Sequence, residues 1–249
     1  MLVKHYALSG FACNGKSTLV KLAKGFVPSD YLVMTSPSVA RHARSIFHNF
    51  NFPFDQQVFE QSILTAETAV FKFINQIKDN LWFLLSKKVK GLVILQERSI
   101  FDVLSFMIAR EYISLTQAVN YLYEFFKELS DTCLYDKLFI VKPIEDYEFI
   151  EKRCVVDIMR GIRDVHNFLA LQDKFYKALN KLISALNGSD NTNNQIKVAE
   201  EIIHLEHPYL NSCTPLSFIS AIREDLVSNN FVSKVLEDFN SHNLNEGAI

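Results

Sequence analysis

A glycine-rich segment followed by lysine and serine constrains the fold more than any other feature of this chain. Residues 10–18 have the sequence GFACNGKST, and the apolar residues 6–8 before them predict a strand that enters the segment. Two glycines at this spacing let the backbone turn tightly, so that successive N–H groups point at a phosphate chain, and the following helix adds its positive end. The segment predicts a nucleoside triphosphate site formed by Gly10, Asn14, Gly15, Lys16, Ser17 and Thr18.

Lys16 and Ser17 have different expected roles in this loop. A lysine at this position reaches the β- and γ-phosphate oxygens as a mobile point charge, and the hydroxyl of the next residue is placed to ligate Mg²⁺. ATP and Mg²⁺ are therefore the expected cofactors. The alternative interpretation is a glycine-rich turn that precedes an ordinary helix.

The composition fits one α/β unit with a core of its own. The chain has 249 residues, of which 49% are hydrophobic, and a net charge of −2. This length and apolar content suffice for a domain that folds alone. The small net charge gives no general attraction to nucleic acid or acidic lipid, so a polyanionic partner would need a local basic patch.

Cysteine usage and hydropathy indicate the compartment. The four cysteines are Cys13, Cys133, Cys154 and Cys213. They show no CxxC or Cys/His pairing, which argues against a zinc site and against a disulfide framework. The expected loop begins too early for a cleavable signal to precede it, and no apolar run approaches the roughly 20 residues of a membrane span. These features predict a cytoplasmic protein without a membrane partner.

Alternating strand and helix patterns predict a parallel sheet that is covered by helices on both faces. The expected strands are residues 3–9, 31–34, 92–95, 137–141 and 195–199. The expected helices are residues 17–24, 38–47, a long helix that follows Asp55, 101–110, 115–129 and 167–186. The sequence thus predicts a three-layer α/β/α domain over residues 1–205, followed by a helical C-terminal extension over residues 206–249.

Charged residues follow the third expected strand directly. Ligands of open parallel sheets bind beyond the carboxyl ends of the strands, so Glu97 and Arg98 are expected in the binding crevice. Glu97 can accept a proton from an attacking hydroxyl or hold the metal through water, and Arg98 can grip the acceptor or the transferred phosphoryl group. Asp102 can contact the acceptor or cap the next helix. A strand-end carboxylate that merely pairs with a nearby arginine is the alternative for Glu97.

An arginine cluster follows the fourth expected strand. Arg153, Arg160 and Arg163 are spaced seven and three residues apart, so on a helix they share one side. In phosphoryl transfer such arginines neutralise charge on the transferred group, often from a mobile lid. We therefore predict a lid over about residues 145–165, with Arg153 binding ATP and the other two acting in catalysis. A solvated helix face with acidic partners is the alternative.

Four further residues are candidates for contact with the phosphate acceptor. Arg41 and Arg44 lie one turn apart after the second expected strand, where they can bind a substrate phosphate. Ordinary surface charge explains them equally well. Gln57 and Gln61 fall on the first turns of the long helix, where their amides can hydrogen-bond a nucleobase edge.

Three motifs together resemble those of the P-loop kinases that act on nucleosides and nucleotides. They are the segments 10–18, ERSIFD at 97–102 and RGIRD at 160–164. The ERS triplet is similar to the signature of deoxyribonucleoside kinases, in which it lies beside the acceptor hydroxyl. The longer pattern resembles small phage and bacterial kinases related to the ribosylnicotinamide kinase domain. The resemblance implies a three-layer P-loop kinase fold with an arginine-bearing helical lid.

The sequence leaves three functions open. The first is an ATP- and Mg²⁺-dependent kinase of a nucleoside, a nucleotide or a related hydroxyl group. The second is a kinase of a hydroxymethylated base within DNA, which would make DNA a substrate. The third is a P-loop ATPase or regulatory switch without a small-molecule acceptor. Beyond the nucleotide and the acceptor, a second copy of the chain is the other partner considered, because the C-terminal extension can pair two chains.

Overall fold

The computed structural model describes residues 2–36, 39, 55–80, 89–127, 129, 133–153, 162, 164–187, 197–208 and 211–228. Five strands form one sheet, namely β1 (Leu2–Ser9), β2 (Tyr31–Ser36), β3 (Gly91–Gln96), β4 (Cys133–Val141) and β5 (Lys197–Leu205). Their order across the sheet is β2-β3-β1-β4-β5, and every neighbouring pair is parallel. The predicted α/β fold with a central parallel sheet is therefore confirmed.

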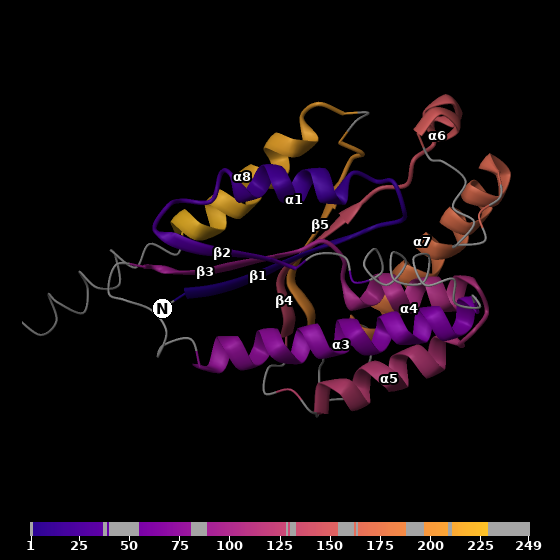
Figure 1. Cartoon of the computed structure of the whole chain (residues 1–249), viewed down its shortest axis with the longest axis horizontal. Helices are drawn as coiled ribbons and strands as arrows, with labels where there is room; N and C mark the ends of the chain where they lie inside the picture. Colours follow the sequence, from indigo (N-terminus) through magenta and orange to yellow (C-terminus); the bar gives the residue numbers. More distant parts are fainter. Residues whose placement is uncertain are drawn as a thin grey trace, which may run out of the picture.

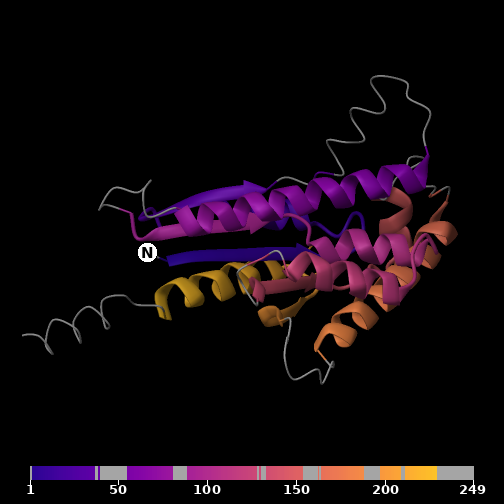
Figure 2. The same ribbon diagram turned by 90° about the horizontal axis from the view of Figure 1, so that it is seen from below.

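Seven helices are described. They are α1 (Lys16–Lys24), α3 (Gln56–Asn80), α4 (Ile100–Ala109), α5 (Leu115–Lys127), α6 (Tyr147–Arg153), α7 (Val165–Asn187) and α8 (Thr214–Ser228). Helices α1 and α8 lie on one face of the sheet, and α3, α4, α5 and α7 lie on the other (Figure 1). Figure 2 shows α3, α4 and α5 from their own side, running along the sheet. The molecule thus has three layers.

Strand β3 shows why the sheet is buried on both faces. All six of its residues, GLVILQ, are buried, and it lies between β2 and β1. A continuous run of β-branched and leucine residues suits a central parallel strand, because helices cover both of its faces. Its register with β1 pairs Ala7 with Gln96, so β1 runs two residues beyond the end of β3, to Ser9. The Ser9 and Ser99 hydroxyl groups are hydrogen-bonded, which joins the end of β1 to the segment after β3.

Two cores separate the layers. One contains the residues of β1 and β4 that face α1 and α8, with Phe218 packed edge-on against Phe139 at a centroid distance of 4.7 Å. The other fills the space between the sheet and the remaining helices, with Phe11, Phe106 and Phe175 in mutual ring contact. Aromatic pairs of this kind add roughly 0.5–1.5 kcal/mol each beyond the burial of their area.

Most expected elements are found, with shifted ends. Asp55 caps α3 as predicted, since its Oδ1 accepts the Val58 N–H at 2.9 Å. Strand β4 begins four residues before the expected start, because Asp136 is satisfied by Lys4 at 3.0 Å and by the His5 N–H at 2.7 Å. A charged residue therefore fits inside this strand.

Strand β5 runs to Leu205, six residues beyond its expected end. It pairs only with β4, and as an edge strand it tolerates the exposed side chains of Glu200, Glu201 and His204. The expected helix at 38–47 lies, apart from residue 39, outside the described residues.

Helix α8 belongs to the C-terminal extension and packs against α1 and the sheet. The Tyr6 hydroxyl of β1 donates to the Asp225 carboxylate at 2.5 Å, and Lys4 approaches the same carboxylate at 3.4 Å. These bonds hold the helix to the central strand. Within the described part of the chain, no helix combines the length and the apolar character that a membrane span requires.

A substitution at Gly91 tests the close approach of β1 and β3. A Cβ atom at this position would lie 2.1 Å from the Leu2 carbonyl oxygen, so Gly91→Ala must push the two strands apart. We expect a loss of about 3 kcal/mol in the free energy of unfolding, measured by urea denaturation. The control is Gly25→Ala, whose Cβ would meet its nearest atom, the Leu22 oxygen, at 3.5 Å. Equal stability of the two variants would contradict the close approach.

Candidate active site

The loop between β1 and α1 has the backbone of a phosphate cradle. Gly10 has a φ of 149° and Gly15 a φ of 71°, and the non-glycine residue Cys13 also has a positive φ of 64°. Gly15 is the residue before α1, and no side chain caps that helix. A Cβ atom on Gly10 would lie 3.0 Å from the Val141 oxygen at the end of β4. Both glycines are thus required by conformation, and the first also by space.

The Asn14 side chain and two distant parts of the chain hold this loop in place. The Asn14 amide donates to the Lys142 oxygen at 2.9 Å and to the Tyr176 hydroxyl at 2.5 Å. The Tyr176 hydroxyl in turn donates to the Val141 oxygen and accepts the Phe11 N–H at 3.3 Å. These bonds tie the loop to β4 and α7. The buried Asn14 side chain is thus engaged in holding the loop.

The Lys16 side chain folds back onto the phosphate loop. Its Nζ donates to the Gly10 oxygen at 2.5 Å and to the Phe11 oxygen at 2.6 Å, and its side chain is only 6% exposed. These two backbone carbonyl oxygens bind the Lys16 ammonium group within the loop. A bound phosphate chain would compete for the same donor.

Ser17 and Glu97 meet at the end of the loop. The Ser17 hydroxyl on the first turn of α1 donates to Glu97 Oε1 at 2.6 Å. The Glu97 backbone N–H is fixed by the Ser36 oxygen at 3.2 Å, which joins the ends of β2 and β3. Ser17 and Glu97, which are both predicted to hold the metal, are therefore neighbours, although they lie 80 positions apart in the sequence.

The oxygens of Ser17 and Glu97 are the ligand type that Mg²⁺ prefers, and Mg²⁺ commonly takes one or two protein ligands beside phosphate and water. Among the described residues no group of three or more His, Cys, Asp or Glu side chains could hold a metal by itself. The Ser17 hydroxyl and the Glu97 carboxylate could thus supply two of the oxygen ligands of a Mg²⁺ ion that also binds phosphate and water.

A buried carboxylate lies beneath the loop. Asp102, on the first turn of α4, is fully buried, and its Oδ1 accepts the Gly10 N–H at 3.1 Å. Burial raises the pKa of this carboxyl, and the charges of Lys16 and Arg98 oppose the rise. Asp102 therefore supports the phosphate loop, and Ser99 rather than Asp102 is the residue that precedes α4. Contact of Asp102 with an acceptor stays a prediction.

Arg98 is a buried cation that no described residue neutralises by an ion pair. Its side chain is 8% exposed, and its guanidinium lies 5.9 Å from the centre of the Phe106 ring. Within the described part of the chain, its Nε has no hydrogen-bond partner. A buried guanidinium in this condition favours an anionic or strongly polar ligand.

A carboxyl group on α3 was not selected from the sequence. Glu67 is 2% exposed, and its Oε2 accepts a bond of 3.4 Å from the Gln96 amide. Burial raises the pKa of Glu67 from 4.5 to about 7, although the Arg98 charge lowers it. The helical spacing from Phe59 and Ile63 (eight and four residues) would have indicated that Glu67 shares their buried face.

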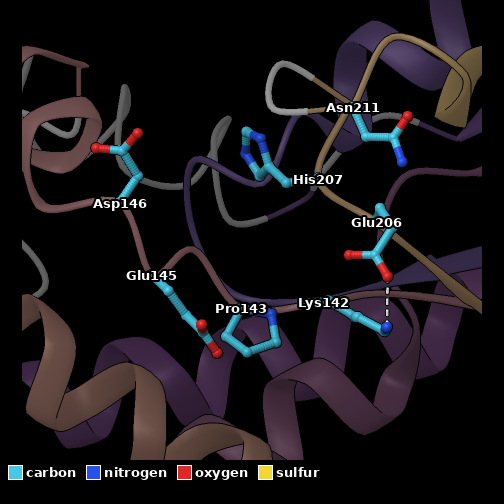
Figure 3. Close-up of a pocket in the computed structure, with 7 residues that line it drawn as sticks. All are labelled: Lys142, Pro143, Glu145, Asp146, Glu206, His207 and Asn211. Carbon is cyan, nitrogen blue, oxygen red and sulfur yellow. Dashed lines mark hydrogen bonds and ion pairs between the residues drawn. The ribbon is translucent and has the colours of Figure 1, made fainter.

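A pocket of about 630 Å³ opens beside the loop, between the segments that follow β4 and β5. It is lined by Lys142, Pro143, Glu145, Asp146, Glu206, His207 and Asn211. In Figure 3 the Glu206 carboxylate points toward the Lys142 ammonium, with which it pairs. His207 Nε2 bonds the Cys13 oxygen at 3.2 Å, and burial lowers the pKa of its imidazole. The pocket is therefore connected to the phosphate loop through His207.

The predicted lid and acceptor residues are only partly described. Arg41, Arg44, Arg160 and Arg163 lie outside the described residues. Arg153 ends α6, and its side chain is also outside them. Gln57 and Gln61 are exposed on α3, whereas Glu67 of the same helix is buried. The residues that the structure brings together are thus Lys16, Ser17, Glu97, Arg98 and Asp102.

Comparison with known proteins shows the fold. No protein-family profile matches the sequence, and no curated protein matches it. Thymidylate kinase from Candida albicans is 15% identical with a TM-score of 0.51, and the match covers 91% of this chain and 92% of that chain. The chain therefore has the same fold as this kinase.

Two further solved structures match over most of this chain. Deoxyadenosine kinase from M. mycoides is 14% identical with a TM-score of 0.49, covering 90% of this chain and 99% of that one. The NadR protein in complex with NR is 16% identical with a TM-score of 0.49, and the match covers 89% of this chain and 49% of that chain.

The raised pKa of Glu67 predicts a pH-dependent stability. Between pH 4.5 and about 7 the unfolded chain releases this proton while the folded chain keeps it, so the free energy of unfolding falls as the pH rises. Glu67→Gln removes this pH dependence. At about pH 8 the free energy of unfolding of the variant should therefore exceed that of the wild type by up to about 3 kcal/mol.

Urea denaturation over this pH range measures the difference between Glu67→Gln and wild type. The control is Glu124→Gln on α5, a carboxylate that is 72% exposed and pairs with Lys127. A difference that does not grow with pH for Glu67→Gln would show that folding does not raise the pKa of Glu67.

Proposed function

We propose that this protein is an ATP- and Mg²⁺-dependent kinase that transfers the γ-phosphate to a hydroxyl group of a nucleoside or nucleotide. The observation that carries the proposal is the contact of Ser17 with Glu97 at the end of the phosphate loop, 2.6 Å apart. It brings a hydroxyl group that can ligate the metal next to a carboxylate that can take the proton of an acceptor hydroxyl. The nucleoside and nucleotide kinases among the similar structures support the same class.

The donor side uses the loop. The backbone N–H groups and Lys16 bind the β- and γ-phosphates, for which Lys16 leaves the Gly10 and Phe11 oxygens. Ser17 would hold Mg²⁺ directly and Glu97 would hold it through water, and the ion would supply positive charge to the phosphate oxygens. The donor base enters the pocket beside His207, where the Glu145 and Asp146 carboxylates can accept bonds from an exocyclic amino group.

The acceptor side uses the crevice after β3. The acceptor hydroxyl oxygen attacks the γ-phosphorus and transfers its proton to Glu97. The bond between the γ-phosphorus and the bridging oxygen of the β-phosphate breaks, and ADP leaves. Arg98 binds the acceptor or the transferred phosphoryl group, because it is a buried guanidinium whose Nε has no partner among the described residues. Arg153, Arg160 and Arg163 would add positive charge from the lid.

Lys16→Ala tests the donor side. Loss of one electrostatic contact to the transferred group costs roughly 3 kcal/mol or more, so turnover should fall at least about 100-fold while the fold is retained. ADP release in the presence of ATP, Mg²⁺ and acceptor measures turnover, and circular dichroism checks the fold. Lys24→Ala, at the exposed end of the same helix, is the control. Turnover of Lys16→Ala near that of Lys24→Ala would contradict the assignment.

Glu97→Gln tests the acceptor side. The amide keeps the size of the side chain but cannot take the hydroxyl proton, so kcat should fall roughly 10²–10⁴-fold. The donor KM should change much less. Glu124→Gln, an exposed carboxylate on α5 that is paired with Lys127, is the control for kcat. A wild-type kcat for Glu97→Gln would remove Glu97 from the proposed mechanism.

An acceptor panel separates the remaining functions. Purified protein is incubated with γ-labelled ATP and, in turn, nucleosides, nucleoside monophosphates and hydroxymethylated DNA. We expect label in a nucleoside or nucleotide. Label in DNA alone, with activity that falls steeply as salt rises, would indicate the DNA-base kinase. ADP release that no acceptor stimulates would indicate an ATPase or switch.

A further inference from the structure

One backbone carbonyl of the phosphate loop is held by an imidazole from a distant part of the chain. His207 Nε2 lies 3.2 Å from the Cys13 oxygen, and the two residues are 194 positions apart. Because a carbonyl oxygen can only accept, Nε2 carries the proton and donates it to this bond. His207 follows β5 after one residue and is only 2% exposed. The loop is thus fixed at Cys13 by a buried side chain.

Cys13 has a backbone conformation that needs such support. Its φ of 64° lies in the left-handed region, which residues other than glycine seldom adopt. Conformations of this kind persist where the surrounding structure enforces them. Gly15 also has a positive φ, whereas Asn14 between them has not, so the sign of φ alternates over residues 13–15. Alternating backbone of this kind forms concave nests of N–H groups that bind anions.

The geometry of the peptide bond connects the Cys13 oxygen with the Asn14 N–H. Both groups belong to one planar trans peptide unit, so they point in opposite directions. A bond that holds the carbonyl toward His207 therefore holds the N–H away from His207. The Asn14 side chain is fixed separately, by the Lys142 oxygen and the Tyr176 hydroxyl. The bond from His207 thus acts on the orientation of the backbone N–H.

The His207 side chain is itself held by its surroundings. The Phe149 ring of α6 meets the imidazole edge-on, with the ring centroids 5.1 Å apart. The Phe149 N–H is bonded to Asp146 Oδ1 at 2.9 Å, which caps the first turn of α6. The His207 backbone oxygen accepts the Asn211 N–H at 2.9 Å. These contacts restrict the imidazole and connect the phosphate loop with the helix that begins the predicted lid.

We propose that His207 is a positioning residue for the donor phosphates, because its bond to the Cys13 oxygen aims the Asn14 N–H at the phosphate chain. The proposal rests on the nucleotide-binding part of the proposed function. His207 also lines the pocket in which we place the donor base (Figure 3), so direct contact with that base is the competing explanation. A ligand that has phosphates but no base distinguishes the two roles.

Titration calorimetry in the presence of Mg²⁺ tests the proposal without turnover. The two ligands are inorganic tripolyphosphate and the non-hydrolysable β,γ-imido analogue of ATP. His207→Leu keeps much of the bulk but has no donor, so both ligands should bind about five- to tenfold more weakly than to wild type. In His207→Gln the amide nitrogen can take the place of Nε2, so both affinities should stay within about twofold of wild type.

Two further variants make the comparison specific. His204→Leu removes an exposed imidazole from β5 and should keep the wild-type affinities. His207→Asn has a shorter amide that does not reach the Cys13 oxygen, so it should bind both ligands as weakly as His207→Leu. Thermal unfolding checks that each variant is folded. If His207→Leu does not fold, the comparison of His207→Asn with His207→Gln decides the question.

The outcomes separate this proposal from the kinase assignment. The role of His207 is wrong, while the kinase assignment stands, if the variants without the donor bind tripolyphosphate as tightly as wild type. It is also wrong if only the ATP analogue binds more weakly, which would indicate contact with the base, or if His207→Gln is as weak as His207→Leu. If the affinities change as expected but no acceptor receives phosphate, only the kinase assignment fails. If wild type binds neither ligand, both fail.

Discussion

The phosphate loop depends on a buried carboxylate that lies beneath it. Asp102 accepts the Gly10 N–H from below, and the charges of Lys16 and Arg98 offset the cost of burying it. The same two cations are the ones that would act on a phosphate chain and on an acceptor. Asn14 and Tyr176 hold the loop from the side. The loop is therefore held by hydrogen bonds from beneath and from the side.

The end of β3 sends two consecutive polar side chains, Gln96 and Glu97, to different helices. Successive side chains of a strand point to opposite faces, so Glu97 meets α1 and the phosphate loop, while Gln96 meets α3. The register of β1 with β3, in which Ala7 pairs with Gln96, places the segment after β3 beside the last residues of β1, just before the phosphate loop. One strand end thus places a carboxylate beside the phosphate loop and a buried amide beside α3.

Local patterns predicted the parts of the fold that short-range physics controls. The apolar run of β3 and the glycine spacing of the loop required no knowledge of their neighbours. The ends of β4 and β5 were missed, because Asp136 is satisfied by Lys4 across the sheet and because β5 lies at an edge. On α3 the polar residues chosen for base recognition, Gln57 and Gln61, are exposed, while Glu67 on the buried face was overlooked.

The sequence by itself determined that a tight glycine-rich loop lies between a strand and a helix, since the conformational freedom of Gly10 and Gly15 is a local property. Only the tertiary structure decided which distant groups complete the site. The bond from Ser17 to Glu97 spans 80 positions, and the pKa of Glu67 follows from its burial beside Arg98. Distance and burial govern both effects, and neither quantity exists until the chain is folded.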